Sequence, residues 1–262
     1  MIEWIELFKS IGKDVKAKVS PLAGSNKAKE VLGRGEFGDN TVYIDRLSED
    51  IVVERILKSG FNCSILTEEK GWIELGAKYP IVIVDPLDGS LNAKRGIPYF
   101  AVSIGVAFGD SIDTINCGYV LNLSNSDEFW AVEGGGAFLN GVRLKNSAKE
   151  VSVVAVEGIK REIEEGTVNK IFSSFYRVRQ SGSTALDICY TASSAFDAFL
   201  HLDPARVVDY AAGKIILEES GGGFFEWLRK VEFTAEVNME KTRPFMAVPH
   251  ISSVDRLIKR LT

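Results

Sequence analysis

The chain carries the stretch Ile81-Val82-Ile83-Val84-Asp85-Pro86-Leu87-Asp88-Gly89-Ser90-Leu91-Asn92, which decides how the rest of the sequence is interpreted. Its first four residues are apolar and β-branched, which predicts a short buried strand that stops at Asp85-Pro86. Pro86 stiffens the turn between the two aspartates. Gly89 lets backbone N–H groups approach an anion closely, and a helix that opens after it would favour phosphate at its N-terminus. Carboxylates beside phosphate require cations between them, and oxygen ligands suit Mg²⁺ or Mn²⁺.

Other acidic positions must support this interpretation, because a turn with two solvated aspartates also explains the stretch. Glu68 and Glu69 are adjacent in the turn-like segment 67–71. Asp45 lies in the first turn of a predicted helix, and Asp209 opens another. Taken singly, these positions are explained by surface glutamates, by a charge that complements a helix dipole and by a helix N-cap.

Composition sets broad limits on the protein. The chain has 262 residues, enough for one large domain or two packed subdomains, and its 45% hydrophobic content is ordinary. A net charge of −5 leaves no basic footprint, which argues against nucleic acid as a partner. The N-terminal segment lacks the pattern of a signal peptide, and no apolar run is long enough for a membrane span. We therefore expect a cytoplasmic protein without a membrane partner. The three scattered cysteines indicate buried free thiols: Cys63, Cys117 and Cys189.

Hydrophobic periodicity predicts helices and strands in both halves of the chain. Helices are expected over 1–19, 41–59, 160–172, 183–199 and 209–220. Strands are expected over 81–84, 100–108, 116–123, 128–133, 151–156 and 175–179. The polar segment 145–150 suggests a boundary, so we expect an N-terminal subdomain over 1–145 and a C-terminal α/β subdomain over 146–262. The alternation of elements predicts a mixed α and β class with layered sheets.

Several other phosphate-handling chemistries lack their required residues. The two histidines, His201 and His250, form no Arg-His-Gly site, and no cysteine is followed six residues later by arginine. The sequence also has no Asp-x-Asp pair and no Gly-Lys-Ser/Thr after a glycine loop. Residues 33–38 match the dinucleotide fingerprint G-x-G-x-x-G, but they follow no strong strand and open no helix, so a glycine loop or hairpin is favoured.

The order of the acidic motifs resembles the inositol monophosphatase and archaeal fructose-1,6-bisphosphatase superfamily of lithium-sensitive, metal-dependent sugar phosphatases. The resemblance covers most of the chain. It rests on Glu68-Glu69, on the DPxDG[T/S] pattern at 85–90 and on the D-x-A-A-G pattern at 209–213. Three further segments are similar to family motifs: GAFLNG at 136–141, GSTALDIC at 182–189 and EESGG at 218–222. It implies a layered α-β-α-β-α sandwich with the active site between its halves, assembled as a homodimer or homotetramer.

The resemblance also implies roles for individual residues. Two or three Mg²⁺ ions, with Mn²⁺ as a substitute, would be bound by Glu68, Asp85, the Leu87 carbonyl, Asp88 and Asp209. Asp85 would bridge two ions, and Glu69 would act on metal-bound water. Asp45 and Ser90 would hydrogen-bond to each other and orient or deprotonate the attacking water. Phosphate or substrate binding would fall to Gly89, Ser90, Ser183, Arg177, Arg179 and Arg206.

Four positions depart from the family pattern. Ser90 stands where threonine is usual, Thr67 where glycine or serine is usual, and Val208 where many members have tryptophan. These changes leave the chemistry intact. Leu202 stands where inositol-selective members often carry glutamate, which puts a preference for inositol in doubt.

We therefore expect a phosphomonoesterase that hydrolyses both fructose-1,6-bisphosphate and inositol monophosphates. A second phosphate needs cationic partners, and arginine binds phosphate oxygens bidentately. Arg177 and Arg179 alternate on a predicted strand and should face one side. The alternatives are an inositol-1-monophosphatase only, a histidinol-phosphate phosphatase, a 3′-nucleotide phosphatase, or a regulatory protein-binding member of the superfamily.

Overall fold

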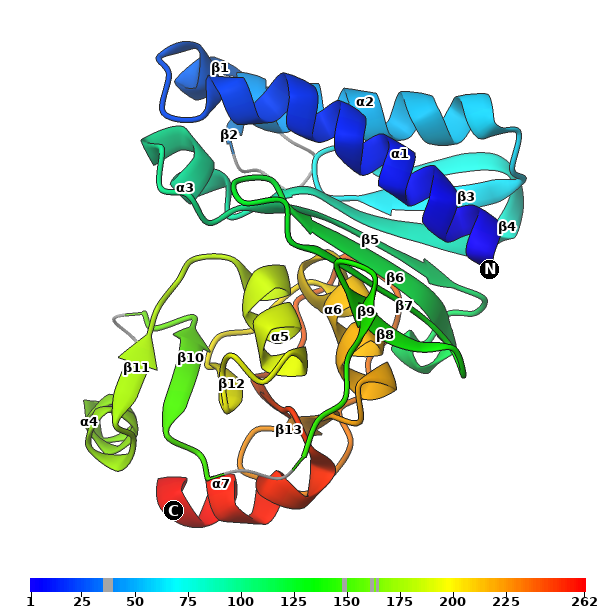
Figure 1. Ribbon diagram of the computed structural model, residues 1–262. Coiled ribbons are helices and arrows are strands. Elements are labelled where there is room, and N and C mark those ends of the chain that lie inside the picture. Colours follow the sequence, from blue (N-terminus) through cyan, green and yellow to red (C-terminus); the bar gives the residue numbers. More distant parts are fainter. Residues whose placement is uncertain (35–39, 148–149, 161–162, 164) are drawn as a thin grey trace.

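The fold has two main β-sheets with helices between and outside them (Figure 1). The computed structural model describes residues 1–34, 40–147, 150–160, 163 and 165–262. Most of the glycine motif 33–38 lies outside the described residues. In the described part of the chain, no helix combines the length and the apolar composition needed to cross a bilayer.

The helices of the described residues are α1 (Ile2–Val19), α2 (Tyr43–Ser59), α3 (Ser90–Arg95), α4 (Glu165–Ser174), α5 (Thr184–Ala192), α6 (Val207–Glu219) and α7 (Val254–Leu261). The larger sheet has the order β3-β4-β5-β6-β7-β8-β9, formed by β3 (Cys63–Thr67), β4 (Gly71–Asp88), β5 (Ala101–Ala107), β6 (Ile115–Asn122), β7 (Glu128–Val132), β8 (Gly136–Leu139) and β9 (Val142–Arg143). The smaller sheet has the order β11-β10-β12-β14-β13, formed by β10 (Val153–Glu157), β11 (Arg177–Arg179), β12 (Ala198–His201), β13 (Gly223–Glu226) and β14 (Phe245–Val248). A separate ribbon pairs β1 (Val31–Arg34) with β2 (Asn40–Val42).

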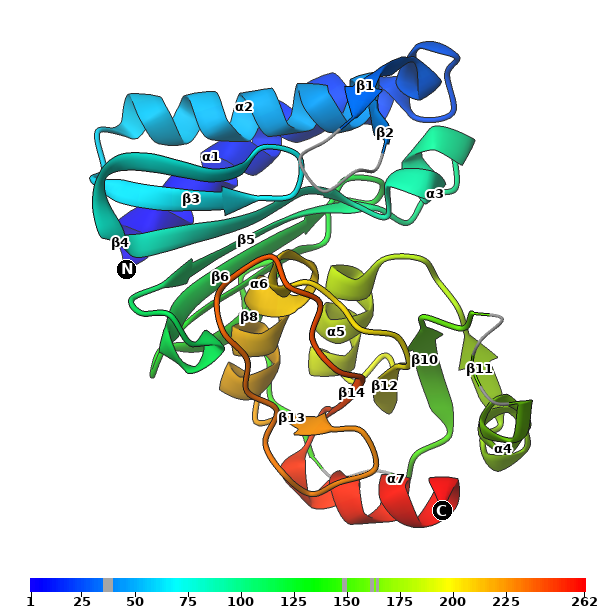
Figure 2. The ribbon, with the colours of Figure 1, turned by 180° about the vertical axis from the view of Figure 1, so that it is seen from behind.

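The layers follow the sequence α-β-α-β-α, as expected (Figures 1 and 2). Helices α1 and α2 cover one face of the larger sheet, and α5 and α6 lie between the two sheets. Helices α4 and α7 cover the outer face of the smaller sheet. Val82 and Val84 pack toward α1 and α2, whereas Ile81 and Ile83 pack toward the middle layer. Burial on both faces therefore explains the uninterrupted apolar run of this strand.

The strand prediction at residues 81–84 needs one correction. Strand β4 does not stop at Asp85-Pro86 but continues to Asp88. Its pairing with β5 shifts there, because Asp85 lies opposite Ser103 and Asp88 lies opposite Ala101. The extra residue in β4 forms a bulge, which accommodates Pro86 since proline has no N–H to donate. The bulge re-aims the side chains at the point where the two aspartates emerge.

A second correction concerns the helix predicted over 183–199. Helix α5 ends at Ala192, and Ser194 adopts a left-handed conformation with φ of 59°. The chain then reverses and enters β12, which pairs with β10 and β14 in the smaller sheet. Small residues are compatible with both a helix and a tight reversal of the chain. Hydrophobic periodicity alone therefore did not show where the helix ends. The three cysteines are buried and free, as expected.

Candidate active site

A cavity of about 320 Å³ opens between the two sheets. Three of the predicted acidic residues line it: Glu68, Asp88 and Asp209. Glu68 comes from the turn after β3, Asp88 from the end of β4, and Asp209 from the first turn of α6. Arg206 and Lys241 supply positive charge to the lining of the same cavity. The fold thus gathers side chains that are up to 173 residues apart in sequence around one cavity.

Asp88 is held by the N-terminus of α5. Its Oδ2 accepts hydrogen bonds from the Ser183 hydroxyl and from the Ala185 amide at 2.8 Å, and its Oδ1 accepts from the Thr184 amide at 3.2 Å. The Thr184 and Ala185 amides are orphan N–H groups of a helix start, where a negative charge is also favoured by the helix dipole. Ser183, predicted to bind phosphate or substrate, therefore contacts the Asp88 carboxylate. Asp85 is also buried, and its Oδ1 accepts from the Leu87 amide at 3.0 Å.

Asp209 reaches the cavity because α6 lies close to the larger sheet. A Cβ added to Gly118 would lie 2.7 Å from the Ala212 carbonyl oxygen, so glycine is required for this approach. Ala211 and Ala212 of the D-x-A-A-G motif are the residues of α6 that lie against Gly105 and Gly118 of the larger sheet. Helix α6 begins at Val207, two residues before the predicted start, and Asp209 Oδ2 accepts from the Arg206 amide at 2.8 Å. Asp209 therefore caps the helix while its side chain lines the cavity.

Burial and mutual repulsion raise the pKa values of these carboxyl groups. The pKa of Glu68 rises to about 8, first through burial and then through Asp209, Glu69 and Asp45. Burial likewise raises the pKa of Asp88 to about 7 and that of Asp209 to about 6. Burial and the neighbouring Glu68 raise the pKa of Asp85 well above its ordinary value. Such a set ionises together only when a cation compensates it.

The donor set fits a hard divalent cation, since all its side-chain ligands are carboxylate oxygens. Among the residues described, no three Asp, Glu, His or Cys side chains already surround a common point as a complete cage. The mutual influence on their pKa values nevertheless places Glu68, Asp85, Asp88 and Asp209 in one cluster.

The predicted water-handling residues lie beside this cluster. Asp45 is buried in the first turn of α2, and its Oδ1 has no hydrogen-bond partner within the described structure. Burial raises the pKa of Asp45 to about 6, although Lys94, 4.0 Å away, lowers it. Ser90 is the first residue of α3, and the described part of the chain shows no hydrogen bond between its hydroxyl and Asp45. An orphaned buried carboxylate oxygen is a site for a further polar partner.

Gly89 and Glu69 are fixed by their surroundings. Gly89 adopts a φ of 81°, and an added Cβ would lie 2.9 Å from the Tyr99 carbonyl oxygen. Only glycine fits this turn between β4 and α3. The Glu69 carboxylate accepts a hydrogen bond from the Thr41 hydroxyl, which lies just before α2. The conformation of the turn at Gly89 and the position of the Glu69 side chain are therefore each restrained by contacts with other parts of the fold.

The predicted arginines do not lie together. Arg206 lines the cavity, with its NH1 3.8 Å from Glu68 Oε1. Arg177 and Arg179 are exposed on β11 and face one side, as expected, while Val178 is half-buried. The Arg177 guanidinium stacks 4.0 Å from the centre of the Tyr176 ring, and neither β11 arginine is among the residues that line the cavity. Their substrate role stays a prediction.

Three residues that sequence reasoning did not select belong to the surroundings of the site. Lys241 and Glu157 line the cavity, and Glu157 accepts a hydrogen bond from the Gly182 amide. Glu49 contacts the turn that carries Glu68 and Glu69. Lys241 lies in an irregular segment with no motif. Glu49 lies four residues after Asp45, and this i, i+4 spacing on a predicted helix was an available signal.

Comparisons with known proteins agree with this architecture. The profile of the inositol monophosphatase family matches residues 3–249. A fructose-1,6-bisphosphatase/inositol-1-monophosphatase of Methanothermobacter thermautotrophicus is 33% identical over 231 residues, which cover 84% of this chain and 82% of that protein. A Nus factor SuhB of Haemophilus influenzae is 34% identical over 194 residues, 71% of each protein.

A crystal structure of an inositol monophosphatase-fructose 1,6 bisphosphatase superposes with a TM-score of 0.86 at 27% identity. The superposition covers 98% of this chain and 99% of that one. The family profile spans most of the chain, and the layered fold and the order of acidic motifs agree with it. The chain therefore belongs to the inositol monophosphatase family.

Proposed function

We propose that the protein is a Mg²⁺-dependent phosphomonoesterase that hydrolyses small sugar and polyol phosphates, fructose-1,6-bisphosphate and inositol monophosphates among them. One observation carries the proposal: buried carboxylates at the end of β4 and half-buried carboxylates from α6 and the turn after β3 gather at one cavity. Burial and neighbouring carboxylates raise the pKa values of Glu68, Asp85 and Asp88, and a divalent cation bound among them would offset both effects. The relatives named as fructose-1,6-bisphosphatase/inositol-1-monophosphatase support the substrate class.

The metal would be held by the Glu68, Asp85, Asp88 and Asp209 carboxylates and the Leu87 carbonyl. Two or three Mg²⁺ ions, with Mn²⁺ as a substitute, suit this oxygen donor set. When bound, such ions acidify water and stabilise charge on phosphate and leaving-group oxygens. The orphaned Oδ1 of Asp45 is suited to accept a proton or a hydrogen bond from the attacking water. Glu69 is close enough to raise the pKa of Asp45, and Ser90 would complete the group that orients the water.

Substrate recognition would use the two walls of the cavity. Backbone N–H groups at Gly89 and Ser90 would hold the phosphate that reacts. Arg206 and Lys241 provide the cationic groups that line the cavity, which suits the second phosphate of a bisphosphate. Thr242 tethers the Lys241 segment, because its amide donates to the Ala205 carbonyl at 2.8 Å.

Other aspects of the proposal follow from the family and the composition. We propose a cytoplasmic homodimer or homotetramer, and a division between residues 1–145 and 146–262. Support for the division comes from β9 and β10, which flank it and belong to different sheets. A regulatory role is a second candidate, because one relative is named Nus factor SuhB. The complete set of acidic residues favours catalysis over regulation alone.

The experiment is a phosphate-release panel with purified protein, with and without Mg²⁺. Its substrates are fructose-1,6-bisphosphate, inositol-1-phosphate, histidinol phosphate and 3′-phosphoadenosine 5′-phosphate. We expect Mg²⁺-dependent release from the first two. Hydrolysis confined to inositol-1-phosphate, histidinol phosphate or the nucleotide would select the corresponding alternative. A folded protein that releases phosphate from none of them would favour the regulatory candidate.

A further inference from the structure

A buried carboxylate outside the cavity contacts the turn that carries two of the acidic site residues. Glu49 lies on α2, one helical turn after Asp45, and is fully buried. It is absent from the residues that line the cavity. Burying an ionisable side chain is costly unless it is hydrogen-bonded and paired, so its contacts indicate what it does.

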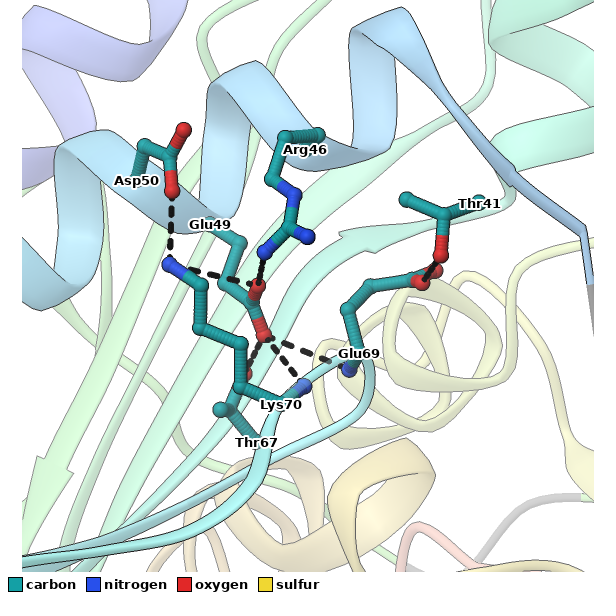
Figure 3. Close-up of polar contacts among 7 residues, drawn as sticks. All are labelled: Thr41, Arg46, Glu49, Asp50, Thr67, Glu69 and Lys70. Atoms are coloured by element: carbon teal, nitrogen blue, oxygen red, sulfur yellow. Dashed lines mark hydrogen bonds and ion pairs between the residues drawn. The ribbon is translucent and has the colours of Figure 1, made fainter. Parts of the chain in front are cut away.

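One oxygen of Glu49 accepts three hydrogen bonds from the segment after β3 (Figure 3). Glu49 Oε1 accepts from the Thr67 hydroxyl at 2.8 Å, from the Glu69 amide at 3.2 Å and from the Lys70 amide at 3.0 Å. Its Oε2 lies 3.6 Å from Lys70 Nζ and 3.6 Å from Arg46 NH1. The carboxylate is therefore both hydrogen-bonded to backbone and paired with cations from the two segments it joins.

These contacts fix the direction of the turn. The amides of Glu69 and Lys70 belong to consecutive peptide units, and each amide is held on the same carboxylate oxygen. Because a peptide unit is planar, fixing two of them restricts the orientation of the Cα–Cβ bonds of Glu68 and Glu69. The Thr41 hydroxyl restrains the Glu69 side chain from the start of the same helix.

Helix α2 therefore carries Asp45 and, through Glu49, also contacts the turn that carries Glu68 and Glu69. Asp45 and Glu49 are four residues apart and lie on one face of the helix. A shift of the turn relative to α2 would change the separation between Asp45 and the pair Glu68–Glu69. The charges at these positions already act on each other, since Asp45 and Glu69 both raise the pKa of Glu68.

We propose that Glu49 is a positioning residue, which sets Glu68 and Glu69 relative to Asp45 through the Glu69 and Lys70 amides. The inference rests on the proposed metal-dependent function of those residues. Partners of metal-binding side chains are worth about 10- to 100-fold in metal affinity or activity. A carboxamide at position 49 keeps the shape and one acceptor oxygen but places an NH₂ group or a neutral oxygen between two cations and two amides.

The test compares Glu49→Gln with Asp50→Asn in the full-length protein. Asp50 is the matched control, since it pairs with the same Lys70 at 2.6 Å but lies on the surface and contacts no turn amide. We expect Glu49→Gln to weaken Mg²⁺ binding to the metal-free protein by about 10-fold or more, measured by calorimetry. We also expect a lower kcat at saturating Mg²⁺, with little change in KM. Asp50→Asn should stay within about twofold of wild type.

Amide hydrogen exchange of the metal-free proteins separates this inference from the proposed function. We expect faster exchange of the Glu69 and Lys70 amides in Glu49→Gln, with unchanged protection elsewhere on β3 and α2. If wild-type protein neither binds Mg²⁺ nor releases phosphate, the proposed function is wrong whatever the exchange shows. If wild type does both and Glu49→Gln matches it in affinity, kcat and exchange, Glu49 has no positioning role.

A variant that removes one donor guards against loss of folding. Thr67→Val keeps the side-chain shape and deletes the 2.8 Å hydrogen bond to Glu49 Oε1. If Glu49→Gln does not fold, Thr67→Val should show the same pattern at a smaller size, about threefold in Mg²⁺ affinity. If Thr67→Val instead lowers thermal stability but leaves Mg²⁺ affinity and kcat at wild-type values, the hydrogen bonds around Glu49 serve stability alone. That result would overturn the proposal.

Discussion

The carboxylates on the two sides of the cavity are held in different ways. Asp88 and Asp209 accept hydrogen bonds from backbone amides at the starts of α5 and α6. Glu68 faces the same cavity from a turn, keeps 33% of its side chain exposed, and has Arg206 NH1 at 3.8 Å. The pKa of Glu68 is raised to about 8, whereas hydrogen bonding limits the rise for Asp88 to about 7 and for Asp209 to about 6.

The proposed metal ligands therefore differ in how firmly the fold holds them. Helix starts supply fixed positions for Asp88 and Asp209, because their amide donors belong to rigid elements. The turn supplies Glu68, whose position depends on Glu49 and on Arg206. The two sides should therefore respond differently to mutation and to pH.

The largest effect is expected from Asp88→Asn. The change removes a charge next to the proposed metal and places an amide NH₂ among donors from Ser183, Thr184 and Ala185. Activity should fall by about 1,000-fold in a protein that remains folded, measured by phosphate release over a Mg²⁺ series and by circular dichroism. Near-wild-type turnover at modest Mg²⁺ would remove Asp88 from the site.

The next largest effect is expected from Asp45→Asn. Asp45 is proposed to contact water rather than metal, so kcat should fall by about 100-fold while Mg²⁺ affinity changes little. Ser90→Ala should behave alike, and Ser90→Thr should be tolerated because it keeps the hydroxyl. Steady-state kinetics gives kcat, and calorimetry gives the Mg²⁺ affinity. A fully active Ser90→Ala protein would show that the water-positioning pair is wrong.

A smaller effect is expected from Arg206→Ala, which removes the cation beside Glu68. The KM for fructose-1,6-bisphosphate should rise by about 10-fold, since a charged phosphate contact is lost, while the KM for inositol-1-phosphate changes less. The double variant Arg177→Ala/Arg179→Ala tests the other two predicted arginines, which are exposed on β11 and do not line the cavity. A raised KM in the double variant would support the substrate role predicted from sequence. Equal losses on both substrates for Arg206→Ala would indicate a general electrostatic role.

The smallest effect is expected from pH in the absence of metal. Native pKa values above the ordinary 3.8 and 4.5 mean that the folded protein binds protons more tightly than the unfolded chain. Stability without metal should therefore fall as pH rises from about 4 to about 8, and the melting temperature should fall with it. Mg²⁺ should oppose this loss and bind more tightly as pH rises. A melting temperature that rises with pH in metal-free protein would contradict these shifts.

Much of the fold was predictable because its signals are local. The apolar run at 81–84 predicted a buried strand, and the structure buries it between two helical layers. The boundary of this strand was wrong, since a bulge that accommodates Pro86 depends on the partner strand β5. The helix predicted over 183–199 was wrong beyond Ala192, because β12 forms only through pairing with β10 and β14.

The sequence by itself determined the class of fold, the order of acidic motifs and the family. Those features depend on residue type and on spacing along the chain, which the tertiary structure does not alter. Only the tertiary structure decided that Arg206 lines the cavity while Arg177 and Arg179 lie on the surface, and that Glu49 is buried against the amides of a distant turn. Burial depth and hydrogen-bond partners are set by contacts between residues far apart in sequence, and no local pattern specifies them.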